Sequence, residues 1–167
     1  MLHLIERLVP APVQRALMPL AHRVRQAWRQ FRNTPIAGVS VIILNSSGDI
    51  LLLRHSYGPK VWALPGGGIK PDEDPAAAAA RELDEELDLS PGPLKRIATL
   101  EETLFDSPHT AHLFCATSDA PPTPDRREVV EARFFSLSAL PDALGSVTQR
   151  RIAAFERHRA DRRSAAP

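Results

Sequence analysis

The chain has 167 residues, of which 43% are hydrophobic and 25% charged, and a formal net charge of +1. This composition is typical of one globular domain with a real core, and the single cysteine, Cys115, excludes an intrachain disulfide. No run approaches the ~18 apolar residues of a membrane span, and we expect no secretory signal. A lone cysteine fits a reducing compartment, so we expect a cytoplasmic protein.

Residues 1–34 are expected to form an amphipathic, basic helical arm. Apolar residues recur at spacings of three and four from Val13 to Phe31, and the first 33 residues carry six arginines against one glutamate. Pro19 lies inside this pattern and is expected to kink or break the helix. The acid-poor start also resembles an organellar transit peptide.

Two interpretations of this arm remain open. Residues 1–32 pack on their own domain or on a second subunit, as in a homodimer, or they lie on an anionic membrane surface. We favour the first. The modest charge and few aromatic residues of the arm give no reason to expect nucleic acid as a partner.

Residues 35–160 are expected to form the main domain, which begins with strands. Segment 37–44 (AGVSVIIL) is apolar and β-branched, residues 45–49 have turn composition, and segment 50–54 reads as the returning strand of a hairpin. A short strand at 62–64 leads into three successive glycines at 66–68. These glycines permit backbone geometries closed to other residues and a close approach of a ligand.

The next segment predicts a helix with an acidic face. Asp74 and Pro75 suit its N-terminus, and the helix is expected to run to about Leu87. Three glutamates spaced three and four residues apart share one face, and like charges at this spacing repel by roughly 0.2–0.5 kcal/mol per pair. A hard divalent cation would turn that repulsion into ligation. The glutamates are Glu82, Glu85 and Glu86, beside an expected apolar stripe of Ala76, Ala79, Ala80, Leu83 and Leu87.

A proline-rich break at 90–93 separates this helix from the remaining elements. Strands are expected within 94–104, 112–116 and 129–137, with a loop at 105–109 between the first two. A closing helix is expected at 146–159, and residues 161–167 are expected to be a frayed tail. The predicted order is therefore three strands, a helix, three strands and a helix.

The residues from 67 to 89 resemble the Nudix box of the Nudix hydrolases. That box reads glycine, five residues, glutamate, seven residues, and then Arg-Glu-apolar-any-Glu-Glu-any-Gly-apolar. Asp88 stands where the family has glycine, which ends the helix in a left-handed conformation that aspartate tolerates better than most residues. The matching positions are Gly67, Glu73, Arg81, Glu82, Leu83, Glu85, Glu86 and Leu89.

The resemblance implies a fold and an activity for residues 36–160. The fold is the Nudix α/β/α sandwich, an α/β (α+β) architecture in which a mixed β-sheet lies between helices. The activity is that of a pyrophosphohydrolase, a hydrolase acting on phosphorus-containing acid anhydrides, in which metal-activated water cleaves a diphosphate bond in a nucleoside diphosphate linked to another group. Mg2+ is the expected cofactor, with Mn2+ as a substitute.

Two questions about the activity stay open. The alternative to an enzyme is a catalytically silent Nudix-fold module that binds a nucleotide or has a regulatory partner, although the complete set of glutamates argues against it. The box specifies a diphosphate and a metal but not the leaving group. ADP-ribose, nucleotide sugars and oxidised nucleoside triphosphates therefore all remain candidate substrates.

The resemblance also implies roles for individual residues. The three glutamates and the main-chain carbonyl of Gly67 would bind the metal, and Glu82 can also act as the base. Arg81 and Glu73 would form an ion pair that orients the helix face. In some relatives a glutamate from a later loop supplies the base or a further ligand, and the candidates here are Glu101, Glu102, Glu128 and Glu131. The candidates for substrate binding are Arg54, Tyr57 and His109.

Overall fold

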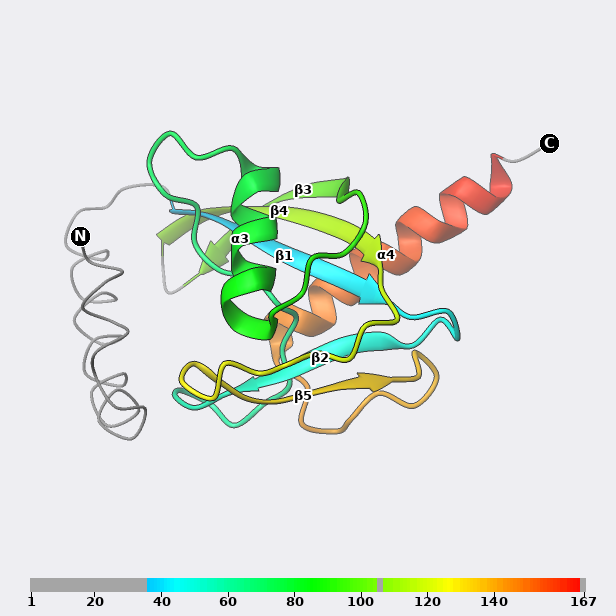
Figure 1. Ribbon diagram of the computed structural model, residues 1–167. Coiled ribbons are helices and arrows are strands. Elements are labelled where there is room, and N and C mark those ends of the chain that lie inside the picture. Colours follow the sequence, from blue (N-terminus) through cyan, green and yellow to red (C-terminus); the bar gives the residue numbers. More distant parts are fainter. Residues whose placement is uncertain (1–35, 105–106, 166–167) are drawn as a thin grey trace.

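The computed structural model describes residues 36–104 and 107–165, which form a five-stranded sheet with a helix on each face (Figure 1). The predicted arm, residues 1–34, lies outside the described residues. The elements in chain order are β1 (Ile36–Leu44), β2 (Ile50–His55), α3 (Pro75–Leu87), β3 (Lys95–Leu104), β4 (Ser107–Thr117), β5 (Val129–Phe135) and α4 (Ser146–Ser164).

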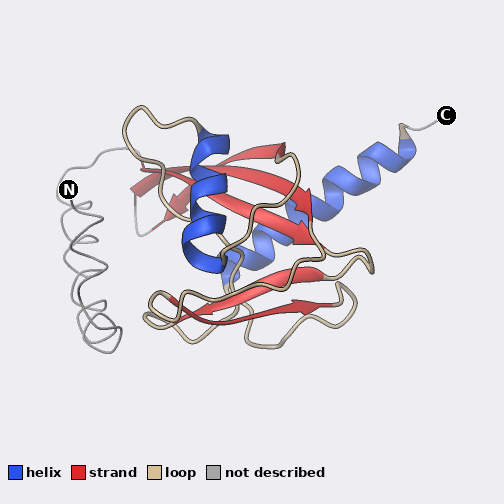
Figure 2. Cartoon of the chain, viewed as in Figure 1, coloured by secondary structure: helices blue, strands red, loops and turns tan. Residues whose placement is uncertain are grey.

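The sheet is mixed, as predicted, with strand order β3-β4-β1-β2-β5. Strands β1 and β4 are parallel, and the other neighbouring strands are antiparallel. Helices α3 and α4 lie on opposite faces (Figure 2). Alternate residues of β1 point to opposite faces, so that Val41 packs with Leu83 of α3 while Ile42 packs with Ile152 of α4.

Strands β1 and β2 separate beyond their hairpin, and the segment leading into the glycines lies between them. The Val39 N–H donates to the Gly67 carbonyl and the Val41 N–H donates to the Pro65 carbonyl, both at 2.9 Å. On the other side, Ala63 bridges to Leu53 of β2. The strand predicted at 62–64 is therefore reduced to isolated bridges, because Pro65 and the glycines do not continue a ladder. The main chain of β1 fixes the position of the glycine loop.

Two predicted boundaries were wrong. Strand β4 begins at Ser107, and its ladder with β3 extends to the Leu104–Ser107 pair, where a loop was expected over 105–109. The sequence there reads as a turn because it contains Pro108, but a strand tolerates proline near its first residue. Helix α4 continues to Ser164, into the expected tail. Among the described residues, no helix is long and apolar enough to cross a membrane.

Candidate active site

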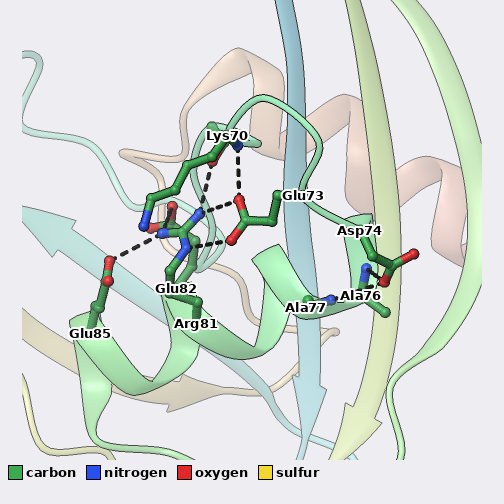
Figure 3. A network of polar contacts seen from close by, with 9 residues as sticks. Lys70, Glu73, Asp74, Ala76, Ala77, Arg81, Glu82 and Glu85 are labelled. Carbon is green, nitrogen blue, oxygen red and sulfur yellow. Dashed lines mark hydrogen bonds and ion pairs between the residues drawn. The ribbon is translucent and has the colours of Figure 1, made fainter.

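Helix α3 is fixed at both ends by aspartates. The Asp74 carboxylate accepts from the N–H groups of Ala76 at 2.9 Å and Ala77 at 3.1 Å (Figure 3). Asp88 has φ 52° and ψ 42°, and its N–H donates to the Asp84 carbonyl. Aspartate thus adopts the left-handed conformation expected for the family's glycine. The capped helix holds its glutamates in a defined orientation.

Of the three glutamates, Glu86 lies within the packed face of α3, where a position beside that face was predicted, whereas Glu85 is exposed. Glu86 is only 5% exposed, and Ala78 is buried as well. Ala80, expected in the apolar stripe, is exposed. The Gly66 N–H donates to Glu86 Oε2 at 3.0 Å, which explains how a carboxylate is accommodated there. Helical periodicity gave the relative directions of these side chains, whereas the glycine loop that covers them comes from another part of the fold.

Gly67 packs directly against Glu82. A β-carbon at Gly67 would lie 2.5 Å from Glu82 Cδ, so any other residue would displace this carboxylate. The Gly67 carbonyl accepts from the Val39 N–H, and a carbonyl oxygen has a second lone pair for another partner. The loop and the helix therefore bring two predicted metal ligands together.

Arg81 connects the glutamates of the predicted box. Its Nε and Nη2 donate to Glu73 at 2.7 and 3.0 Å, which forms the predicted ion pair (Figure 3). Its Nη1 donates to Glu82 at 2.7 Å and to Glu85 at 3.1 Å, and its Nη2 also reaches the Gly68 carbonyl at 3.1 Å. One guanidinium therefore orients three carboxylates and contacts the glycine loop.

The carboxylates of the site differ in the direction in which their pKa is shifted. Hydrogen bonds from Arg81 lower the pKa of Glu73 to about 2. Burial raises the pKa of Glu82, and it raises that of Glu86 well above the ordinary value. The charge of Glu82 raises the pKa of Glu86 further. Two desolvated carboxylates thus lie close enough to repel one another, and a cation would relieve that repulsion.

We expect Glu73→Gln to weaken the dependence of stability on acidic pH. The folded chain holds Glu73 ionised down to about pH 2, whereas the unfolded chain takes up this proton near its ordinary pKa of 4.5. The resulting stabilisation is complete above the ordinary pKa and is lost as the pH falls toward 2. Urea denaturation at about pH 6 and about pH 3 measures it, with EDTA present to exclude metal ions. Equal loss of stability in wild type and variant would contradict the Arg81–Glu73 contact.

Among the later glutamates, Glu128 is the one that acts on the acidic site. Its charge and that of Asp125 both raise the pKa of Glu86. Asp125 was missed by sequence reasoning, because a single aspartate after a proline-rich loop carries no distinctive spacing. The Tyr57 hydroxyl donates to Glu128 Oε2 at 3.4 Å, so this predicted substrate residue also lies beside the site.

The other three candidates have partners elsewhere. Glu101 is exposed and accepts from Thr110. Glu131 forms ion pairs with Arg133 at 2.9 Å and with Arg54 at 3.4 Å. Arg54, a predicted substrate residue, thus pairs with Glu131. Its guanidinium carbon also lies over the Trp62 ring, 5.6 Å from the ring centroid. Glu102 pairs with Arg151 of α4, which no sequence pattern singled out.

The donor set fits a hard divalent cation in its chemistry. Glu82, Glu85, Glu86 and the Gly67 carbonyl offer only oxygen atoms, which Mg2+ and Mn2+ prefer. Within the described part of the chain, no three acidic, histidine or cysteine side chains are gathered closely enough to hold a metal. Arg81 Nη1 instead contacts both Glu82 and Glu85. The carboxylates are therefore neighbours on one helix that a cation would draw together.

Comparison with known proteins identifies a matching family. The model of the NUDIX domain family matches residues 34–155. An RNA pyrophosphohydrolase from Rhodospirillum rubrum is 40% identical over 50 residues, which are 30% of this chain and 30% of that protein. Diphosphoinositol polyphosphate phosphohydrolase 2 from Rattus norvegicus is 38% identical over 69 residues, 41% of this chain and 37% of that protein. The matched segments thus span less than half of these relatives, whose names are those of hydrolases, the class predicted for this chain.

Solved structures confirm the predicted fold class. The MutT NUDIX hydrolase from Burkholderia pseudomallei superposes with a TM-score of 0.65 at 23% identity, over 72% of this chain and 98% of that chain. The MutT protein from Methanosarcina mazei Go1 gives a TM-score of 0.64 at 28% identity, over 77% and 96%. With a family model that matches well over half of the sequence and a fold that agrees, the chain belongs to the Nudix hydrolase family.

Proposed function

We propose that the chain is a divalent-metal-dependent pyrophosphohydrolase that cleaves the phosphoanhydride bond of a nucleoside diphosphate linked to another group. The observation that carries the proposal is the pair of desolvated carboxylates, Glu82 and Glu86, packed under the glycine loop. Arg81 offsets part of the charge of Glu82, whereas the charges that act on Glu86 are acidic, and burying charge in this way is costly unless a counter-charge is bound. A divalent cation would supply the counter-charge at the place where a diphosphate would bind.

The metal would be Mg2+, or Mn2+ in its place, held by Glu82, Glu85, Glu86 and the Gly67 carbonyl. When bound, such a cation neutralises charge on the diphosphate and lowers the pKa of water. The chain's own groups prepare this site: the Gly66 N–H orients Glu86, and Arg81 orients Glu82 and Glu85. These contacts hold the carboxylates as neighbours, and a cation would draw them together as it replaces contacts of Arg81.

We propose Glu82 or Glu128 as the group that accepts the proton of the attacking water. Glu82 lies against the glycine loop, and Glu128 lies within electrostatic reach of Glu86. General-base assistance of this kind contributes on the order of 10²–10⁴-fold. We propose Tyr57 and His109 as contacts for the substrate. Tyr57 bonds to Glu128, and a β-carbon at Gly38 would lie 3.0 Å from both His109 Nε2 and the Gly67 carbonyl oxygen. Arg54 is proposed with them as a phosphate contact, although it pairs with Glu131 and the Trp62 ring, which lie outside the carboxylate group.

A substrate panel tests this function. The structural neighbours also include the NUDIX domain of Shewanella oneidensis NrtR complexed with ADP ribose and a C. elegans Ap4A hydrolase. The panel therefore contains ADP-ribose, a UDP-sugar, an oxidised nucleoside triphosphate, Ap4A, a diphosphoinositol polyphosphate and RNA with a 5′ polyphosphate. We expect at least one compound to be hydrolysed with Mg2+ and not with EDTA, measured as phosphate released in a phosphatase-coupled assay. Absence of hydrolysis throughout the panel, with Mg2+ and with Mn2+, would overturn the proposal.

A further inference from the structure

A buried polar cluster lies on the α4 side of the sheet, outside the acidic site. Glu102 of β3 accepts from Arg151 Nη2 of α4 at 3.1 Å, and Arg151 Nη1 donates to the Ser40 hydroxyl of β1. His109 of β4 is 5% exposed, and its Nδ1 lies 3.8 Å from the same Glu102 oxygen. The Arg150 Nε lies 3.8 Å from the other Glu102 oxygen. Two strands and a helix therefore meet at one carboxylate, and Arg151 extends the cluster to β1.

Fold stability alone gives little reason for this cluster. The surrounding core is apolar and includes Ile42, Leu113 and Ile152. Glu102 and Arg151 side chains are only 9% and 12% exposed, and the desolvation of such a pair offsets much of its attraction. Apolar side chains of similar volume often serve a fold equally well. An ion pair kept in this position therefore points to a task in orientation.

Gly38 joins the cluster to the glycine loop. A β-carbon at Gly38 would lie 3.0 Å from His109 Nε2 and also 3.0 Å from the Gly67 carbonyl oxygen. The imidazole nitrogen and the carbonyl thus flank the same point, where Gly38 places no side chain. On its other side, Gly67 packs against Glu82. Residues that lie next to one another therefore lead from Arg151 of α4, through His109 and the glycines, to the acidic helix α3.

We propose that Glu102 and Arg151 are positioning residues that hold His109 so that its Nε2 contacts the diphosphate of the substrate. Glu102 and His109 are direct partners in the β3–β4 ladder, so the carboxylate faces the Nδ1 edge of the ring. Arg151 secures that carboxylate by bonding it together with Ser40. The opposite edge, Nε2, then faces the loop at Gly67, where an imidazole N–H would bond well to a phosphate oxygen. This inference rests on the proposed function.

Glu102→Gln tests the inference against a matched control, Glu101→Gln. Glu101 is the neighbouring residue but is exposed and bonded to Thr110. For the best substrate of the panel, we expect Glu102→Gln to raise KM about 10-fold or more, the scale of one hydrogen bond to a charged group, and to leave kcat nearly unchanged. The dissociation constant of α,β-methylene-ADP with Mg2+, measured by calorimetry, should rise equally. Glu101→Gln should behave as wild type in both measurements.

Three further variants separate positioning from folding. The double variant Glu102→Gln, Arg151→Met leaves no unpaired buried charge, so it should fold and yet keep the raised KM. His109→Gln should reproduce that KM, whereas His112→Gln, on the same strand and beside Thr99, should not. In 15N spectra of the histidine rings without ligand, the His109 signal should move in Glu102→Gln and stay in place in Glu101→Gln.

The outcomes distinguish this inference from the proposed function. If wild type hydrolyses a substrate and both Glu102 variants keep its KM and analogue affinity, the positioning role is wrong and the pyrophosphohydrolase stands. If wild type neither hydrolyses the panel nor binds the analogue, both proposals are overturned. The assignment is supported if KM rises in the Glu102 variants and in His109→Gln, while the controls Glu101→Gln and His112→Gln keep the wild-type KM.

Discussion

Glu86→Gln is expected to abolish most metal-dependent turnover and, at the same time, to stabilise the metal-free protein near neutral pH. Glu86 is 5% exposed, and burial together with the charges of Glu82, Glu128 and Asp125 raises its pKa. An ionised Glu86 therefore opposes folding when no cation is present. Glutamine removes the charge and keeps an oxygen that can accept from the Gly66 N–H. Turnover should fall on the order of 10²–10³-fold, the scale for removing one preorganised electrostatic group.

The direction of the stability change follows from proton linkage. A carboxyl whose pKa is raised by folding binds more protons in the folded state than in the unfolded state, so its ionisation destabilises the fold as the pH rises. The melting temperature of Glu86→Gln in EDTA should therefore exceed that of wild type at neutral pH, and the two should converge on acidification below the ordinary carboxyl pKa. Glu85→Gln is the control, since Glu85 is 41% exposed: it should lose turnover without the gain in stability. A lower melting temperature for Glu86→Gln would contradict the buried charge.

Gly67→Ala is expected to reduce turnover about 10²-fold, the effect of misplacing a reacting group by about 1 Å, with little change in melting temperature. The added β-carbon would overlap the Glu82 carboxylate, which is the mobile end of a flexible side chain and can move aside. The fold should tolerate that movement, whereas a metal ligand or base would be displaced. The backbone of Gly67 does not require glycine, since its φ lies outside the left-handed region.

Gly92→Ala is the matched control for this prediction. Gly92 also lies outside the left-handed region, and a β-carbon there would meet no atom within 4 Å. Its turnover and melting temperature should equal those of wild type. If Gly67→Ala retained wild-type turnover, Glu82 could not be acting from the position that it occupies against the glycine loop.

The box could be found in the sequence because its chemistry is local. Helical spacing places Glu82, Glu85 and Glu86 on one side of α3, and the caps depend on single residues such as Asp74 and Asp88. The positions of most strands along the chain followed from apolar segments separated by turns. The ion pair of Arg81 and Glu73 also followed from the box, although its extension to Glu82 and Glu85 did not.

What the sequence did not reveal depends on elements far apart in the chain. Glu86 is buried because the glycine loop pairs with β1, an arrangement that periodicity within α3 does not encode. Of the four later glutamates considered as a base or further ligand, Glu128 lies near the acidic site because its loop approaches α3. Arg151 reaches Glu102 only because α4 packs across the sheet. The helical arm over residues 1–34 and the domain boundaries stay predictions.

Titration of the metal-free chain with Mn2+ tests the central claim most directly, because it requires no substrate. The measurement compares wild type with Glu86→Gln and with the control Gly92→Ala by calorimetry, and Mg2+ is added as a competitor. We predict saturable Mn2+ binding in wild type and Gly92→Ala, displaced by Mg2+ and weakened at least about 10-fold in Glu86→Gln. Equal affinity in all three proteins, or no saturable binding in wild type, would contradict a cation held by the carboxylates of α3.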